Sequence, residues 1–171
     1  MNAGFIAILE NTPDCIVRRC YSAGDVSAIG ANGPISGFIA MIKMAKVTEA
    51  MNCTVEQCLA WNKKVETSTT SATTWSSGAI VGVSSNTNTY TDCYRRADME
   101  YSENCGGTEY TLFDQENSSP TSPLAYDPAM VNKCPYHGKA APTGATCADV
   151  PKTLNWPEDV WDLSGEMPKL K

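Results

Sequence analysis

Apolar residues in the first part of the chain come in short runs that polar turns separate. Ile, Val, Phe and Tyr dominate the runs, and Gly, Asn, Ser and Thr flank them. Short runs between turn-forming residues are typical of strands, because an amphipathic helix needs a longer periodic stretch. One phrase opens three of these stretches, as Gly4-Phe5-Ile6-Ala7, Gly37-Phe38-Ile39-Ala40 and Gly78-Ala79-Ile80-Val81. The pattern therefore predicts a repeating unit made of strands.

Each copy of the phrase leads into a cysteine with a bulky neighbour. The pairs are Cys20-Tyr21, Cys58-Leu59 and Cys93-Tyr94, and the cysteines lie 38 and 35 residues apart (58 − 20 and 93 − 58). A unit of this size cannot bury its own apolar face, so it stacks on copies of itself. Parallel strands about 4.8 Å apart would place the three cysteines in one ladder. We therefore predict an all-β solenoid, a parallel β-helix of about three coils.

The repeat also resembles a known family. The phrase Gly-Phe-Ile-Ala, a polar stretch and then Cys20-Tyr21-Ser22-Ala23-Gly24-Asp25-Val26 is similar to the GLUG-type repeat of large secreted proteins of gut commensal bacteria. Gly78-Ala79-Ile80-Val81-Gly82 is closest to the family phrase, whereas Ala7 and Ala40 stand where the family has a second glycine. The tail from Tyr136 to Leu170 resembles the segment that closes such arrays. The resemblance implies a right-handed parallel β-helix with a C-terminal cap, displayed on a longer exported protein, and it implies no catalytic residues.

We expect three segments within a single domain. GLUG-like β-helix repeats occupy residues 1–100, an irregular insertion with loops occupies residues 101–135, and a C-terminal capping segment occupies residues 136–171. Within them, the Ser- and Thr-rich stretch Thr67–Ser77 and the Ser-, Asn- and Pro-rich stretch Gln115–Pro123 predict loops that leave the coils.

The closing segment is expected to cover the open end of the solenoid, whose exposed backbone would otherwise pair with another chain. Thr146 is the predicted cap of one or two helical turns, although Pro151 argues against a longer helix. A final strand is predicted at Asp159–Leu163.

Charge and length exclude several functions. The 171 residues suffice for one core, and the net charge of −6 without a basic cluster disfavours nucleic acids and anionic membranes. No apolar run approaches the roughly 20 residues that a membrane span needs. The repeat phrase follows Met1 at once, where a signal peptide would begin with a basic and then an apolar region. We interpret the chain as a C-terminal piece of a longer exported protein, located outside the cell or on its surface.

The eight cysteines allow two kinds of chemistry. In an exported protein they can form disulfides, and in a reducing compartment they would more often bind metal. Cys15-x4-Cys20 and Cys53-x4-Cys58 lie at the edge of the spacing of a four-cysteine zinc site. The third copy, however, has Asn88 where a first cysteine would stand. A core ladder explains the recurring second cysteine more simply, so we predict no metal and no cofactor, with a zinc module as the alternative.

Disulfides are expected in the irregular regions. Cys134 and Cys147 bracket a Gly- and Pro-containing stretch that can bend to the required geometry, and their bond would pin the closing segment. Cys93 with Cys105 is a second candidate. Pairs on neighbouring coils are disfavoured, because in-register side chains stay about 4.8 Å apart whereas a disulfide prefers Cβ atoms near ~3.8 Å.

Few residues suggest catalysis. His137 is the only histidine, which excludes a His-based zinc hydrolase, and we expect its side chain to bond the backbone in a turn. Asp92 and Asp98 flank two arginines and are expected to form solvated ion pairs. No Asp-x-Asp-x-Asp-Gly pattern supports a calcium site for the aspartates. The chain is therefore not expected to be an enzyme, with a polysaccharide-cleaving β-helix as the alternative.

The tryptophans suggest a ligand. Trp61 and Trp75, in or near polar loops, can offer flat platforms to sugar rings, although Trp61 can equally pack on a neighbouring coil. Trp156 and Trp161 are expected in the core of the closing segment. We predict a structural or adhesive module of a surface protein that binds extended glycans or host surface polymers, with a passive stalk as a further alternative.

Overall fold

The structure, a computed structural model, describes residues 2–10, 14–30, 35–43, 53–69, 77–84, 88–105, 108–110 and 136–171. Three successive coils hold equivalent sets of short strands. Coil 1 contains β1 (Asn2–Ala3), β2 (Ile6–Glu10), β3 (Ile16–Arg18), β4 (Tyr21–Ser22) and β5 (Val26–Ile29). Coil 2 contains β6 (Ile35–Ser36), β7 (Ile39–Lys43), β8 (Thr54–Glu56), β9 (Leu59–Ala60) and β10 (Lys64–Thr69). Coil 3 contains β11 (Ser77–Gly78), β12 (Val81–Ser84), β13 (Thr89–Thr91), β14 (Tyr94–Arg95) and β15 (Glu100–Cys105).

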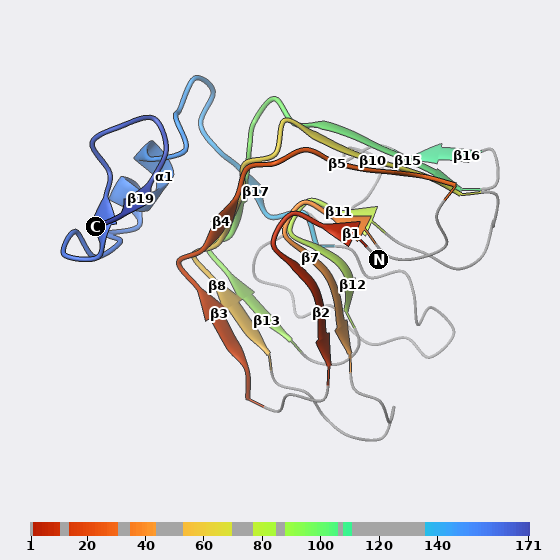
Figure 1. Cartoon of the computed structure of the whole chain (residues 1–171), viewed down its shortest axis with the longest axis horizontal. Coiled ribbons are helices and arrows are strands. Elements are labelled where there is room, and N and C mark those ends of the chain that lie inside the picture. The colour runs from red at the N-terminus through yellow and green to blue at the C-terminus, as the bar shows by residue number, and fades with distance from the viewer. Residues whose placement is uncertain are drawn as a thin grey trace.

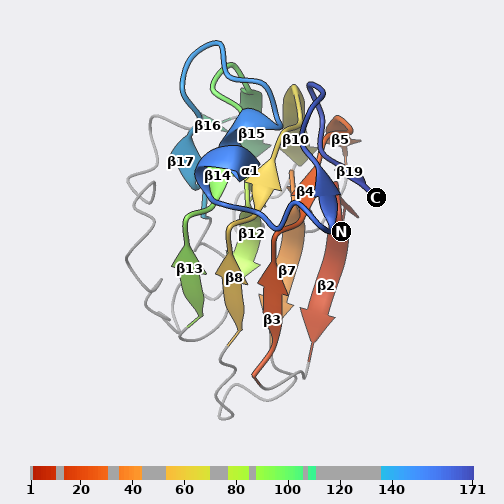
Figure 2. The same cartoon turned by 90° about the vertical axis from the view of Figure 1, so that its left-hand side faces the viewer.

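Equivalent strands of the three coils pair in parallel. The sheets run in the orders β1-β6-β11, β2-β7-β12, β3-β8-β13, β4-β9-β14 and β5-β10-β15. Figure 1 shows the coils along the stacking direction, and Figure 2 shows β3, β8 and β13 side by side. The predicted parallel β-solenoid of about three coils is confirmed. Within the described ranges, no helix has the length and hydropathy that a membrane span requires.

Alternation along the strands builds the core. In β3 the middle residue Val17 is buried while Ile16 is exposed. Val17 pairs with Val55, which pairs with Tyr90, so one column of apolar side chains runs through the three coils. Their offsets of 38 and 35 residues (55 − 17 and 90 − 55) equal the spacing of the repeated cysteines. The period of the sequence is therefore the register of the sheets.

The repeated glycine marks a place where the coils approach closely. Asn62 is fully buried there, and its amide donates a hydrogen bond to the carbonyl of Gly24. Ser22 donates from its hydroxyl to the carbonyl of Gly37 at 2.5 Å. A Cβ atom at Gly4 or Gly37 would overlap the side chain of Asn62. Only a glycine leaves room for this inward-pointing amide.

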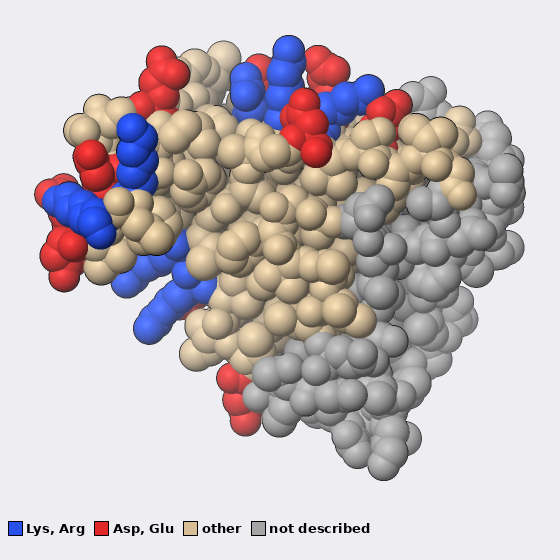
Figure 3. All heavy atoms as spheres, in the orientation of Figure 1, with Lys and Arg blue, Asp and Glu red and all other residues tan. Residues whose placement is uncertain are grey.

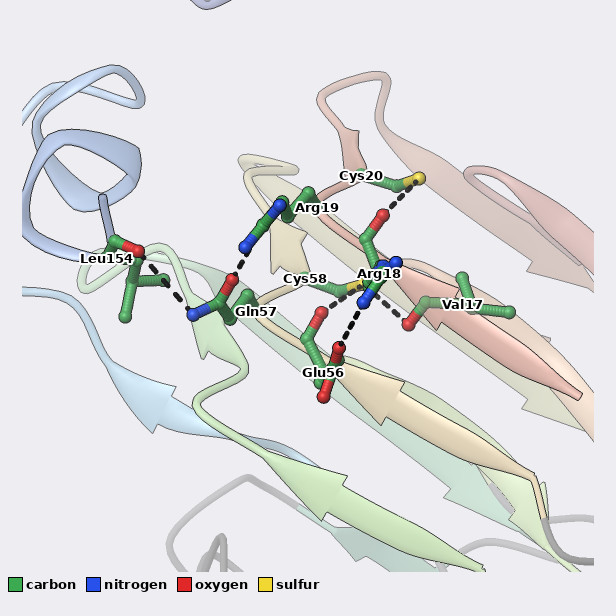
Figure 4. A network of polar contacts seen from close by, with 8 residues as sticks. All are labelled: Val17, Arg18, Arg19, Cys20, Glu56, Gln57, Cys58 and Leu154. Atoms are coloured by element: carbon green, nitrogen blue, oxygen red, sulfur yellow. Dashed lines mark hydrogen bonds and ion pairs between the residues drawn. The ribbon is translucent and has the colours of Figure 1, made fainter. Parts of the chain in front are cut away.

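A left-handed residue turns each coil at the corner before β4, β9 and β14. Arg19, Gln57 and Asp92 have φ of 54°, 53° and 48°. The next residue is in each case the repeated cysteine, and its thiol donates to the carbonyl two residues earlier, from Cys20 to Arg18 at 3.2 Å, from Cys58 to Glu56 at 3.3 Å and from Cys93 to Thr91 at 3.6 Å. Figure 4 shows the first two of these bonds. Each of the three repeated cysteines therefore stabilises the corner of its coil through a hydrogen bond from its thiol to the backbone.

The closing segment lies on the side of the solenoid and not across its end. It contains α1 (Asp149–Thr153), β18 (Trp161–Asp162) and β19 (Lys169–Leu170), and it packs on the sheet of β4, β9 and β14. Figures 1 and 2 show it against this lateral face. The prediction that the segment covers the open end was therefore wrong for residues 141–171, because the outward row Tyr21, Leu59 and Tyr94 offers them an apolar surface on the side.

The first residues of the closing segment, 136–140, and the earlier strand β16 cover part of coil 3. β16 (Thr108–Tyr110) runs antiparallel to β15, and β17 (Lys139–Ala140) adds a fourth strand beside β14. Tyr136 is fully buried and stacks on Tyr90 with ring centroids 4.4 Å apart. This short stretch therefore closes the solenoid core beneath coil 3.

Several predicted boundaries need correction. The predicted loop Thr67–Ser77 begins inside β10 and ends in β11, and coil 3 continues past residue 100 as β15. Thr67 belongs to the strand because it is buried and its hydroxyl donates to the carbonyl of Ala28 at 3.4 Å. The helix cap is Ala148 rather than Thr146, although Thr146 does donate to the Asp149 carboxylate at 2.7 Å. The predicted loop at 115–123 lies outside the described residues.

Candidate ligand groove

A groove of about 620 Å³ lies where the closing segment meets the coils. The coils contribute residues that follow β4, β9 and β14, and the closing segment contributes the turn after β17 and the approach to β19. The lining residues are Ala23, Trp61, Arg96, Ala97, Asp98, Pro142, Thr143, Gly144, Ala145, Thr146, Cys147, Glu166 and Met167. Apolar walls with a few polar groups are typical of small-molecule sites.

Trp61 is the large aromatic residue of this groove. Its backbone N–H donates to the carbonyl of Ser22 at 2.7 Å, which fixes the residue at the end of β9. Its side chain is 8% exposed and packs with Leu59, Cys147 and Trp156. Trp61 therefore belongs to a core and also lines the groove, and its role as a platform for sugar rings stays a prediction. Trp75, the second predicted platform, lies outside the described residues.

The charged groups of the groove are paired or open to solvent. Arg96 lies 2.5 Å from Asp98, and this hydrogen-bonded contact lowers the pKa of the Asp98 carboxyl. Asp98 is 65% exposed, so the pair contributes little stability. Asp92 pairs instead with Lys139 at 3.0 Å. The expected solvated pair with an arginine is confirmed for Asp98, whereas the partner of Asp92 is a lysine of the closing segment and not an arginine.

Arg95 behaves differently from its neighbour. Its guanidinium donates to the carbonyl of Gly138 at 2.5 Å, and burial lowers its pKa. Sequence reasoning placed both arginines with the aspartates. The alternation of the strand separates them, because adjacent residues point to opposite faces.

His137 lies in the core and not in the groove. Its side chain is fully buried, its Nδ1 accepts a hydrogen bond from the Ala79 N–H at 3.2 Å, and Tyr101 packs edge-on against its ring at 5.1 Å. The expected bond from this side chain to the backbone is confirmed. Burial lowers the pKa of His137 to about 3, and the positive charge of Arg95 adds to this shift.

His137 should make the protein sensitive to mild acid. The unfolded histidine has a pKa of about 6.5, so below this pH the unfolded chain binds a proton that the folded chain refuses until about pH 3. The stability is complete above about pH 6.5 and falls as pH decreases. We expect the free energy of unfolding to be about 2 kcal/mol lower at about pH 5 than at about pH 8. Urea denaturation at a series of pH values measures this.

The control for this prediction is His137→Asn, whose Oδ1 can still accept from Ala79. The variant should show a flat profile over the same range. Asp149, whose pKa is lowered to about 2 by hydrogen bonds from Thr146, loses its contribution only at lower pH and does not interfere. An equal slope in wild type and variant would contradict the assignment to His137.

The structure does not gather the other candidate ligands. Among the described residues, no group of three or more His, Cys, Asp or Glu side chains is placed to hold a metal ion. Asp25 instead accepts from the backbone N–H groups of Lys63 and Lys64 at 3.1 and 2.9 Å. Cys147 is buried beside the groove with a free thiol, and Cys134 lies outside the described residues. The bond between these two cysteines stays a prediction.

The closing segment supplies the part of the groove that sequence reasoning missed. Trp156 is 2% exposed and Trp161 packs against it at 5.0 Å, as predicted for the core of this segment. Glu166 and Met167 reach the groove only because this core docks beside β9. No motif marks these two residues in the sequence. A scan of protein-family models and searches of curated proteins and solved structures find no match to this chain.

Proposed function

We propose that this solenoid is a structural and adhesive module of a secreted or surface-anchored bacterial protein, and that it binds glycan chains in the groove beside the closing segment. The resemblance to GLUG-type repeats is the reason for proposing a secreted or surface-anchored bacterial protein. The observation that carries the ligand is the groove itself, which Trp61 lines together with polar side chains.

The lining suits a sugar better than an apolar ligand. Met167 and the part of Trp61 that lines the groove offer apolar surface to the C–H face of a pyranose. Glu166 and Asp98 offer carboxylate oxygens that can accept hydrogen bonds from its hydroxyl groups. The groove is open at the surface, so a longer chain can continue beyond the bound unit. In each coil the strand that follows the lining residues is β5, β10 or β15, and Figure 3 shows basic and acidic side chains intermingled over these strands. A neutral polymer fits such a surface.

A blocking variant tests the site without disturbing the core. Ala97 is an exposed residue of the groove, and Ala97→Trp would fill the space. We expect wild type to bind members of a panel of immobilised glycans and mucins, and Ala97→Trp to lose at least about tenfold in affinity, which is about 1.4 kcal/mol. The matched control is Ile29→Trp, which places an added indole at a residue 67% exposed and outside the groove. Equal binding by both variants would remove the groove from consideration.

A second candidate function follows from the two carboxylates. Asp98 and Glu166 both line the groove, and glycoside hydrolysis uses a pair of carboxylates on either side of the scissile bond. Incubation with pectins, alginates and glycosaminoglycans would then release new reducing ends, and Glu166→Gln would abolish the release. Absence of both binding and turnover would leave the passive stalk as the function.

A further inference from the structure

Five of the cysteines in the coils form two ladders with different surroundings. In the corner ladder of Cys20, Cys58 and Cys93, every thiol already donates to a backbone carbonyl. Cys58 and Cys93 donate in addition to carbonyls of the preceding coil, at 3.4 and 3.3 Å, and both are fully buried. Figure 4 shows the thiol of Cys58 held between two carbonyls. The thiols of Cys58 and Cys93 are therefore satisfied and closed to reagents from solvent, whereas Cys20 is half-buried.

The second ladder contains Cys15 and Cys53. The register of β3 on β8 pairs Ile16 with Thr54, so the cysteines that precede them are neighbours on adjacent coils. The Thr54 N–H donates to the carbonyl of Cys15 at 2.7 Å, which holds the two backbones together. The thiol of Cys53 has that of Cys15 as its hydrogen-bond partner. The register and this interaction place the two side chains next to each other on adjacent coils.

The position below this pair is not a cysteine. Asn88 occupies it on coil 3, and its side-chain oxygen accepts from the Cys53 N–H at 3.0 Å. This ladder consequently contains two sulfur atoms, and each has one possible partner within it. In the corner ladder of three cysteines, by contrast, the middle residue Cys58 has two possible disulfide partners.

Exposure to solvent also favours a bond between Cys15 and Cys53. Cys15 is half-buried on coil 1, while Cys53 is fully buried behind it. A disulfide reagent in solution can therefore reach the first sulfur but not the second. Burial raises the pKa of the Cys53 thiol to about 12, with a further contribution from Cys15, so exchange begins at Cys15 and is completed by Cys53.

We propose that Cys15 and Cys53 form a disulfide that staples coil 1 to coil 2 when the protein meets an oxidised low-molecular-weight thiol such as oxidised glutathione. The Cys15 thiolate attacks one sulfur of oxidised glutathione and releases one molecule of reduced glutathione. The Cys53 thiolate then attacks the Cys15 sulfur of the mixed disulfide and releases the second. Two protein thiols are oxidised, one glutathione disulfide is reduced, and the two protein protons end on the released thiols.

The geometry of this bond requires a small movement only. Cα atoms on neighbouring parallel strands lie about 4.8 Å apart, inside the range of about 4.4–6.8 Å found for disulfides, but the Cβ atoms must approach to about 3.8 Å. Cys15 and Cys53 come just before Ile16 and Thr54, the first paired residues of β3 and β8. The backbone there can therefore move more easily than within a strand. The expectation that coils are not cross-linked therefore applies to the corner ladder and not to this pair.

Peptide mapping of the whole chain tests the staple. The reduced protein is incubated with oxidised glutathione at mildly alkaline pH, remaining thiols are alkylated, and a non-reducing digest is analysed by mass spectrometry. We expect a linked peptide that joins Cys15 to Cys53, and a rise of roughly 5–15 °C in Tm that a reductant reverses. Cys53→Ser should carry glutathione on Cys15.

The matched control is Cys20→Ser, which removes a half-buried cysteine of the other ladder. This variant should form the same linked peptide as wild type. Glutathione on Cys15 of the wild-type protein without the linked peptide, unmodified thiols at both positions, or a bond from Cys15 to any other cysteine would each overturn the proposal. The wild-type map alone decides the matter even where a variant fails to fold.

Discussion

Trp156→Ala is expected to release the closing segment from the solenoid and to lower the free energy of unfolding of that segment by about 3–5 kcal/mol. Trp156 is 2% exposed and lies in the cluster of Leu59, Val150 and Leu163. Truncation removes a buried indole from this cluster and leaves a cavity, because the surrounding structure relaxes only in part. The groove should be lost with it, because Glu166 and Met167 hold their places through the same packing.

Limited proteolysis and near-UV circular dichroism would measure this effect. We expect cleavage within residues 141–171 to accelerate strongly while the strands of the coils stay protected. Val160→Ala is the control, because Val160 is 43% exposed in the same segment and should change stability by no more than about 0.5 kcal/mol. Similar protease resistance in wild type and Trp156→Ala would contradict the role assigned to this cluster.

Trp156→Phe separates packing from polarity. The indole N–H of Trp156 is buried without a hydrogen-bond partner among the described residues. Phenylalanine keeps most of the apolar contact and removes that unsatisfied donor. The stability gained by removing the donor offsets part of the stability lost with the smaller side chain. It should therefore cost clearly less than alanine, which the same proteolysis assay measures.

Gly37→Ala is expected to lower the free energy of unfolding of the coils by about 2–3 kcal/mol. A Cβ atom there would lie 2.5 Å from the Asn62 Oδ1 and 2.6 Å from the Ala79 carbonyl oxygen. Neither neighbour can move freely. Asn62 is fully buried and held by its bond to Gly24, and the carbonyl belongs to the backbone of coil 3.

The matched control is Gly24→Ala, since a Cβ atom at Gly24 meets nothing within 4 Å. Urea denaturation followed by circular dichroism compares the two variants. Gly24→Ala should unfold within about 0.5 kcal/mol of wild type. Equal midpoints for both alanine variants would show that the coils can separate at Gly37 at no cost, and would contradict the close approach described here.

The repeat explains why most of the coil architecture was predictable. Parallel strands in register carry equivalent residues at a nearly constant offset. The spacing of Cys20, Cys58 and Cys93 therefore predicts which strands pair. The corner role of these cysteines was not predictable. It depends on the left-handed residue before each one, and Arg19, Gln57 and Asp92 share no chemical type that would mark such a conformation.

Polar composition misled the prediction at the end of β10. Thr67 was placed in a loop because it begins a Ser- and Thr-rich stretch, yet it is buried and its hydroxyl donates to the backbone of the neighbouring coil. β-branched threonine suits a strand when a sheet offers it a partner. Composition alone cannot reveal that partner.

The sequence by itself determined the class of fold, the number of coils and their register, because each follows from a period that is written along one dimension. The tertiary structure alone decided where the closing segment docks, that His137 is buried, and that a groove forms between Trp61 and Glu166. These features depend on contacts between segments far apart in the chain. Packing of side chains selects such contacts, and no local pattern encodes them.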